Sequence, residues 1–317
     1  MRIAVLDDWA GVARDSAPWG SLDAEIRFFD APIPSAELAR ALAPFDVVCL
    51  MRERTPFPAA LLEALPALRL IVTTGARNLS IDVSAAKARG VTVCGTRSRK
   101  TTTSELTLAM VLHQGRRLGE ESARLATGGF QGPPGRDLAD LRVGLVGLGN
   151  VGAQVAALCR AFGSTVRAWS PNLTDERAAE RGVGRATSLE ALAAGADVLS
   201  IHMVLSERTA GLLGAEALAA LPTGALVVNT SRAGLLDRSA LFDWLERDAS
   251  ARAAIDVFET EPLPADDPWR EAKARFGERL LLTPHLGYVT RATWELFYAE
   301  TVEAIAAFAA GAPVREL

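Results

Sequence analysis

The clearest indication of the fold is the stretch RVGLVGLGNVG, residues 142–152. Its apolar start predicts a buried strand, and Gly147, Gly149 and Gly152 follow in the spacing G-x-G-x-x-G, directly before a helix expected over residues 153–162. The first two glycines permit a tight turn and a close approach of the backbone to a ligand, and the third lets the helix pack on the strand. The start of such a helix offers N–H groups and a positive dipole end to a pyrophosphate. This stretch therefore predicts a doubly wound dinucleotide-binding domain.

The same alternation of strands and helices continues on both sides of this stretch. After it, strands are predicted at residues 165–169, 198–202, 226–229, 253–257 and 280–283. Before it, strands are predicted at residues 1–8, 46–51, 68–73 and 91–94. This βαβ pattern is typical of parallel sheets. The predicted fold class is α/β, with two Rossmann-like doubly wound parallel-sheet domains and an active-site cleft between them.

The two series of strands predict two domains, one of them split in sequence. A chain of 317 residues exceeds the usual size of one hydrophobic core. An Ala-rich amphipathic helix from about Arg291 follows the second series and is free to pack on the first. We therefore expect a discontinuous substrate domain, residues 1–98 plus 288–317, and a dinucleotide-binding domain, residues 99–287.

Composition excludes several other classes of protein. Hydrophobic residues make up 49% of the chain and charged residues 23%, and no apolar run is long enough to span a bilayer. The net charge of -4, with acids and bases interspersed, argues against a nucleic-acid surface. Cys49, Cys94 and Cys159 lie too far apart in sequence to encode a zinc cluster or a disulfide framework. We expect a cytoplasmic protein that uses no metal, membrane or nucleic acid.

Polar residues follow three strands of the second series, at the edge where open α/β sheets bind ligands. Arg232 lies in NTSRAG, Glu259 and Glu261 lie in DVFETEPLP, and His285 lies in TPHLG. A single residue of each kind is more often a solvated or structural group. Together, a cationic clamp, an acid and an imidazole form the set that carbonyl reduction needs. The histidine can give a proton to the carbonyl oxygen as hydride reaches the carbon, and a glutamate on its other ring nitrogen fixes the tautomer.

The position that contacts the adenosine ribose departs from the usual pattern. Rossmann domains carry an acid at the end of the second strand, which bonds the ribose hydroxyls. Here the sequence AWSPN places Ser170 at that position, followed by Asn172. Both side chains can hydrogen-bond either ribose, and no arginine follows immediately to bind a 2′-phosphate. NAD and NADP both remain open, and a plain β-turn is the alternative interpretation of this stretch.

These motifs resemble the D-isomer-specific 2-hydroxyacid dehydrogenase family over nearly the whole chain. The resemblance rests on VTTGARNLSID, TSELTLA, GLVGLGNVG, VVNTSRAGLLD, AIDVFETEPLP and TPHLG, in this order. It implies an NAD(P)-dependent oxidoreductase that transfers a hydride to or from a small, D-specific 2-hydroxy/2-keto acid. Arg232, Glu261 and His285 are then the catalytic residues. The family also implies a homodimer, and it leaves the identity of the acid open.

The resemblance implies further binding residues. Asp256 would contact the nicotinamide amide, and Arg52 and the Gly75–Ala76 turn would bind the substrate, the turn through its backbone N–H groups. The predicted cofactor-binding set is Gly147, Gly149, Asn150, Val151, Gly152, Ser170, Asn172, Met203, Thr230, Ser231, Asp256 and Gly287. His113 is expected to pack in a helix, and His202 to be structural or to line the cofactor. Departures at Ser170, at Val204 and at Tyr288 bear on cofactor and substrate preference.

Two other functions compete with this prediction. The first is a catalytically weak binding protein of the same fold that senses the dinucleotide, although a pure sensor has no need of the full Arg/Glu/His set. The second is formate oxidation, but formate dehydrogenases that resemble this family carry Gln at the position of Glu261.

Overall fold

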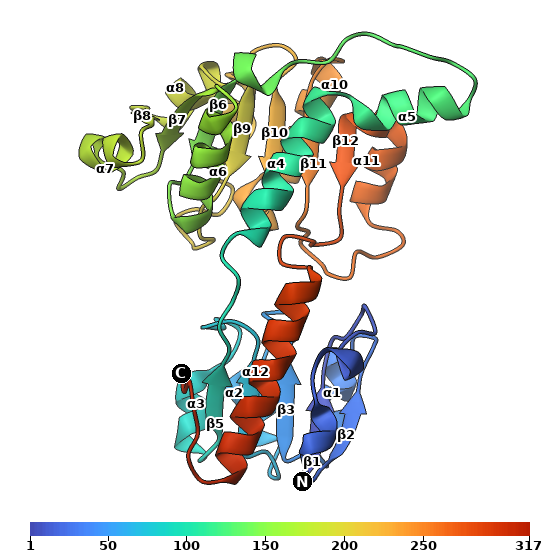
Figure 1. Cartoon of the computed structure of the whole chain (residues 1–317), viewed down its shortest axis with the longest axis vertical. Helices are drawn as coiled ribbons and strands as arrows, with labels where there is room; N and C mark the ends of the chain where they lie inside the picture. The colour runs from blue at the N-terminus through green and yellow to red at the C-terminus, as the bar shows by residue number, and fades with distance from the viewer. The chain divides into compact units, whose positions relative to one another are not determined.

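The computed structural model describes all residues from 1 to 317, which form two compact units (Figure 1). Unit 1 comprises Met1–Arg99 and Val289–Leu317, and unit 2 comprises Lys100–Tyr288. The assignment of one unit to substrate and the other to cofactor stays a prediction. No helix in either unit has both the length and the apolar character needed to cross a membrane.

Unit 1 is built on a five-stranded parallel sheet with the strand order β2-β1-β3-β4-β5. The strands are β1 (Arg2–Val5), β2 (Glu25–Phe28), β3 (Val47–Leu50), β4 (Leu70–Thr73) and β5 (Thr92–Gly95). The helices are α1 (Ser35–Leu42), α2 (Ala59–Glu63), α3 (Val83–Ala88) and α12 (Arg291–Ala309). Every residue of β3 and β4 is buried, as expected for strands covered on both faces. Helix α12 reaches this unit from the far end of the chain and packs against β4.

Unit 2 is built on a seven-stranded parallel sheet with the strand order β12-β11-β10-β9-β6-β7-β8. The strands are β6 (Arg142–Val146), β7 (Thr165–Trp169), β8 (Gly184–Arg185), β9 (Val198–Ile201), β10 (Leu226–Asn229), β11 (Arg252–Ile255) and β12 (Leu280–Leu282). The helices are α4 (Thr102–Gly115), α5 (Leu118–Ala126), α6 (Asn150–Ala161), α7 (Asp175–Glu180), α8 (Leu189–Ala194), α9 (Ala215–Ala219), α10 (Arg238–Arg247) and α11 (Pro268–Phe276). The predicted parallel α/β fold is thereby confirmed in both units.

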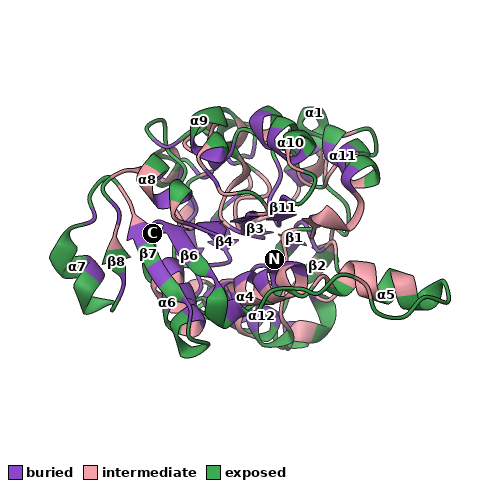
Figure 2. Cartoon of the chain, turned by 90° about the horizontal axis from the view of Figure 1, so that it is seen from above, coloured by how far each residue is buried: buried purple, intermediate pink, exposed green.

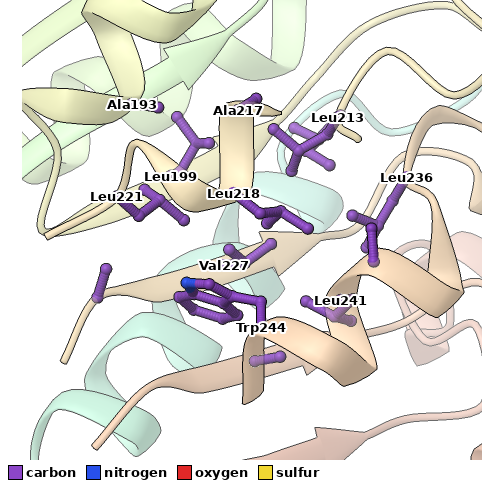
Figure 3. Close-up of a cluster of buried hydrophobic side chains, with 14 of the residues drawn as sticks. Ala193, Leu199, Leu213, Ala217, Leu218, Leu221, Val227, Leu236, Leu241 and Trp244 are labelled. Carbon is purple, nitrogen blue, oxygen red and sulfur yellow. The ribbon is translucent and has the colours of Figure 1, made fainter. Parts of the chain in front are cut away.

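Each face of the unit 2 sheet is covered by its own hydrophobic cluster. Adjacent residues of a strand point to opposite faces, and Val227 belongs to one cluster while Val228 belongs to the other. Figure 3 shows Leu218 of α9 and Leu241 and Trp244 of α10 gathered around Val227. The cluster on the other face includes residues of α4 and α6. Two filled layers hold the strand ends in place, and the candidate site lies on those ends.

Two strands and one helix differ from the rest in burial. The short strands β2 and β8 were not among the predicted strands, because both are partly exposed and neither forms an apolar run. Helix α5 has no buried residue, and Figure 2 shows it in green and pink, in contrast to the purple strand β6.

The order of the strands in the unit 2 sheet reverses direction between β6 and β9. Ligands of doubly wound sheets bind at such a point.

Candidate active site

The glycine turn after β6 uses each of its three glycines for a different reason. Gly147 has a φ of +104°, and a Cβ there would lie 2.5 Å from the backbone oxygen of His202. A Cβ on Gly152 would lie 2.2 Å from the oxygen of Gly147, so only glycine lets α6 pack this closely. At Gly149 a Cβ would meet no atom within 4 Å. Gly149 thus leaves open space beside the unpaired N–H groups at the start of α6. The turn fits a pyrophosphate.

The loop after β7 holds Ser170 in a half-buried position and Asn172 in an exposed one. The carbonyl of Ser170 accepts a hydrogen bond from the Leu173 N–H at 3.1 Å. Arg185 of β8 donates to the Leu173 carbonyl at 2.8 Å and lies 3.5 Å from Asp175. Sequence reasoning did not consider Arg185, because β8 is too short to be seen in the hydrophobic pattern.

Asp256 organises the turn that carries His285. Its Oδ1 accepts hydrogen bonds from Thr283 Oγ1 at 2.5 Å and the Leu286 N–H at 2.7 Å, and its Oδ2 accepts one from the Gly287 N–H at 2.9 Å. These bonds support His285 at a φ of +52°, which non-glycine residues rarely adopt. Asp256 is 0% exposed, and burial raises the pKa of its carboxyl. Within the turn, Asp256 Oδ1 accepts two hydrogen bonds and Oδ2 accepts one, and the expected contact of Asp256 with the nicotinamide amide stays a prediction.

His285 and Glu261 form a hydrogen-bonded pair. Glu261 Oε2 lies 2.7 Å from His285 Nδ1, and Glu261 Oε1 accepts the Phe258 N–H at 3.0 Å. A carboxylate at Nδ1 favours the tautomer with its proton there, which leaves Nε2 to exchange a proton with a ligand. The Tyr288 ring packs edge-on against the imidazole, with 5.3 Å between centroids. Both members of the pair are partly accessible, with 23% of the His285 side chain and 19% of the Glu261 side chain exposed.

The structure separates the two loop glutamates that the residues alone left open. Glu259 accepts a hydrogen bond from Trp269 Nε1 at 3.0 Å and lies 3.6 Å from Arg238. It is therefore engaged away from the imidazole, while Glu261 is paired with it.

Arg232 follows β10 in a loop that Asn229 holds. Asn229 Oδ1 accepts the Ser231 N–H, and its Nδ2 donates to the Arg232 carbonyl, both at 3.0 Å. The guanidinium donates to the Ser231 carbonyl at 2.8 Å, and Ser231 Oγ donates to the Met203 carbonyl at 2.7 Å. Sequence reasoning missed Asn229. An asparagine that ends a buried strand and can close an Asx turn is the signal that would have identified it.

Hydroxyl groups of α4 hold three segments of unit 2. Thr103 Oγ1 donates to the Gly287 carbonyl at 3.0 Å, and Thr107 Oγ1 lies 2.8 Å from Thr230 Oγ1. Ser104 Oγ donates to Gln154 Oε1 of α6 at 2.9 Å. Thr103 and Thr107 are four residues apart and share one helix face. Sequence reasoning assigned these hydroxyl groups no part in holding the site.

His202 lies directly beneath the glycine turn. Its Nε2 is 2.9 Å from Ser200 Oγ, and burial lowers the pKa of His202 to about 4. The ring is therefore neutral near pH 7 and supports the turn rather than carrying a charge. His113 lies in the last turn of α4, and its side chain is neither fully buried nor fully exposed.

In unit 1, Arg52 folds over Gly75. Arg52 has a φ of +55°, and its Nη1 donates to the Thr74 carbonyl at 3.3 Å. A Cβ on Gly75 would lie 1.8 Å from Nη1, so this conformation requires glycine. The Gly75 N–H donates to Thr96 Oγ1 at 2.8 Å. Of the two amides predicted to receive a carboxylate, that of Gly75 is already bonded, and Ala76 is exposed.

Comparison with protein families matches residues 108–287 to the NAD binding domain of the D-isomer specific 2-hydroxyacid dehydrogenases. The chain therefore belongs to this family. The D-3-phosphoglycerate dehydrogenase of Mycobacterium leprae is 34% identical over 290 residues, which are 90% of this chain and 53% of that protein. That of Bacillus subtilis is 33% identical, covering 88% of this chain and 52% of its own length. The chain thus spans about half the length of these curated relatives.

Solved structures show the same fold. A phosphoglycerate oxidoreductase from Vibrio cholerae matches with a TM-score of 0.89 and 32% identity, covering 98% of this chain and 100% of that one. A D-lactate dehydrogenase from Aquifex aeolicus, solved with NAD and lactic acid, has a TM-score of 0.79 and 22% identity, covering 98% of this chain and 96% of that one. At that identity, the second comparison speaks for the fold alone.

Proposed function

We propose that this protein is an NAD-dependent oxidoreductase that moves a hydride between the nicotinamide cofactor and a small D-2-hydroxy/2-keto acid. The observation that carries the proposal is the His285–Glu261 pair at 2.7 Å, on a turn held by Asp256. It lies in the unit that also contains the glycine turn. A proton-transfer group and a dinucleotide-binding turn within one unit are the two parts that this reaction needs.

Residues that would hold the cofactor fall into three groups. The glycine turn, with Asn150 and Val151, would bind the pyrophosphate, and Ser170 and Asn172 would contact the adenosine ribose. Met203, Thr230, Ser231 and Gly287 would line the nicotinamide side. When bound, the nicotinamide supplies or accepts the hydride. Because Ser170 replaces the usual acid, we propose that NADP is also accepted, with weak discrimination between the two cofactors.

The chain's own residues would manage the proton and the charge of the substrate. His285 Nε2 gives a proton to the carbonyl oxygen during reduction and takes it back during oxidation. The carboxylate of Glu261 stabilises the imidazolium through Nδ1. Arg232 binds the substrate carboxylate through its planar fork and polarises the adjacent carbonyl. Arg52 and the amide of Ala76 are the proposed substrate-binding groups of unit 1.

A substrate panel tests this proposal. The purified protein would be assayed with NADH and with NADPH against the 2-keto acids that correspond to D-3-phosphoglycerate, D-lactate and D-glycerate, and with formate and NAD. The phosphorylated acid comes first in the panel because the relatives named above are D-3-phosphoglycerate dehydrogenases. We expect turnover of at least one 2-keto acid. Tight NADH binding without turnover of any member would instead favour the sensing protein, and turnover of formate alone would favour formate oxidation.

We also propose that the protein is a cytoplasmic homodimer. Light scattering after size-exclusion chromatography would measure the mass, for which a dimer of a 33.6 kDa chain is expected. A monomer mass at micromolar concentration would contradict this part of the proposal without affecting the catalytic assignment.

A further inference from the structure

Unit 2 contains a cavity at the amino ends of its strands, and the glycine turn lies at their carboxyl ends. The cavity has a volume of about 320 Å³. Its walls include Val198, Leu226 and Arg252, the first residues of β9, β10 and β11, and Leu141, which directly precedes β6. The strands are parallel, so the candidate active site lies at their other ends. This cavity is therefore separate from the proposed catalytic residues.

Arginines give the cavity an excess of positive charge. Its lining includes the side chains of Arg117, Arg136 and Arg252 and a single carboxylate, that of Asp197. Glu120 lies beside Arg117 and Arg252, so three cations against two anions leave a net charge of about +1 at neutral pH. The Arg252 side chain is only 12% exposed, so its charge faces the cavity and its neighbours more than bulk water. Opposite charges are attracted more strongly there than at an open surface.

Hydrogen bonds already hold these guanidinium groups in place. Arg252 Nη1 donates to Gln114 Oε1 at 2.8 Å, and Arg252 also pairs with Glu120. Arg136 Nη2 lies 2.9 Å from Asp197 Oδ1. Ordered arginine forks lose little further side-chain freedom when an anion binds between them.

These guanidinium groups have more hydrogen-bond donors than there are acceptors around them. Each guanidinium has five N–H donors. Arg117 Nε has essentially no exposed surface and no hydrogen-bond partner, and the carboxylate of Glu120 lies 3.5 Å from Arg117 Nη2. A buried donor without an acceptor is unfavourable, so a ligand that carries several acceptor oxygens would relieve this deficit.

We propose that this cavity binds a compact polyanion, either a phosphate ester or a di- or tricarboxylate. Phosphate and carboxylate oxygens match the arginine fork in charge and geometry. Pro134, Leu141, Val198 and Leu226 supply an apolar wall for the carbon skeleton of such a molecule. The volume lies at the lower end of the range for small-molecule sites, and this favours a metabolite-sized ligand over a nucleotide.

Calorimetric titration of the full chain would test the site. Inorganic phosphate and citrate would be used separately, at low ionic strength, with sodium chloride as the control for charge screening. The variants are Arg117→Gln and Arg136→Gln, and the matched control is Arg247→Gln, an exposed arginine of α10 that bonds only within its own helix. We expect both pocket variants to weaken anion binding about tenfold or more, and the control to bind like the wild type.

Anion binding at the glycine turn has to be distinguished from binding in this cavity. An anion at the start of α6 would be displaced by saturating NADH and would be unaffected by Arg117→Gln or Arg136→Gln. Equal affinity in all four proteins, or no binding of either probe at 10 mM or about that concentration, would overturn the proposal. Arg117→Gln leaves the Asp197 ion pairs intact, so it stays informative if Arg136→Gln does not fold. The test needs no catalytic turnover.

Discussion

At the scale of single residues, the partners of each acid decide its part in the site. Sequence patterns identified the chemical set of Arg, Glu and His, because motifs at strand ends are visible in the chain itself. The choice between Glu259 and Glu261 needed either the resemblance or the structure, since it depends on which acid reaches the imidazole. Asn229 was missed for a similar reason. Its importance lies in two hydrogen bonds to backbone two and three residues away.

Glu261 and Glu259 offer a matched pair of variants. Glu261→Gln removes the charge that stabilises the imidazolium, so we expect kcat to fall by about 10²-fold or more with little change in NADH affinity. Glu259→Gln should leave kcat nearly unchanged, because Glu259 contacts Trp269 and Arg238 instead. Steady-state kinetics with the best acid of the panel would measure both. Equal losses in the two variants would remove Glu261 from its assigned role.

Asp197 predicts how stability depends on pH. Burial by itself would raise the pKa of the Asp197 carboxyl, but hydrogen bonds from Arg142 and Arg136 outweigh burial and hold that pKa well below its usual range. A carboxyl with a lowered folded-state pKa stabilises the fold above its unfolded pKa of about 3.9 and loses this contribution as pH falls further. Asp197→Asn should therefore melt at a lower temperature than wild type at pH 7.

The pH series supplies the control for that variant. Between about pH 5 and pH 3 the wild-type melting temperature should fall more steeply than that of Asp197→Asn. In this range the Asp197 carboxyl takes up a proton in the unfolded chain but stays ionised in the folded protein, and the variant has no carboxyl there. Asp243→Asn, a change at an exposed acid of α10, should follow the wild type. Parallel melting curves for wild type and Asp197→Asn across this range would show that the Asp197 pairs add no net stability.

At the scale of elements, buried strands and the glycine turn were predictable, while exposed elements were not. Strands such as β3, β4 and β9 are fully buried and mostly apolar, and such stretches are visible in sequence. Strand β2 alternates exposed and half-buried residues, and β8 has only two residues, so neither produces a signal. The role of the hydroxyl groups on α4 was not predicted for another reason. Its partners Gly287 and Thr230 are far from it in sequence.

The glycine turn allows binding and folding to be separated by two similar substitutions. Gly149→Ala places its methyl group in open space, at a φ of -74° that any residue adopts. We expect unchanged thermal stability but NADH affinity weakened about tenfold or more, because the methyl group occupies the approach to the start of α6. Gly152→Ala should instead lower stability by about 2 kcal/mol, since its Cβ would lie 2.2 Å from the Gly147 oxygen.

Thermal melts and NADH titrations of the two alanine variants would check this contrast. The result that contradicts it is a stable Gly152→Ala protein, or a Gly149→Ala protein that binds NADH like the wild type. In the second case the pyrophosphate would have to bind elsewhere in unit 2.

At the scale of the whole molecule, unit 1 is completed only after unit 2 in the sequence. Unit 2 is continuous in sequence, whereas unit 1 lacks α12 until residue 291. Within unit 1, Glu300 of α12 is 4% exposed and accepts hydrogen bonds from the Arg97 N–H and Nε at 2.6 and 2.5 Å. Tyr298 of the same helix packs on Trp19 with 5.9 Å between ring centroids. The core of unit 1 thus depends on a helix that follows unit 2 in the sequence.

Fragments of the chain would test this dependence. Residues 100–288 should fold alone and unfold cooperatively, because they contain a complete sheet with both of its covering layers. Residues 1–99 should not fold alone, since β4 would expose the face that α12 covers. Joining residues 1–99 to 289–317 through a short Gly/Ser linker should restore cooperative unfolding. Circular dichroism during urea denaturation would measure all three. If the 1–99 fragment unfolds cooperatively with the stability of the joined form, α12 is dispensable for unit 1, and its burial there contributes little to the free energy of unfolding.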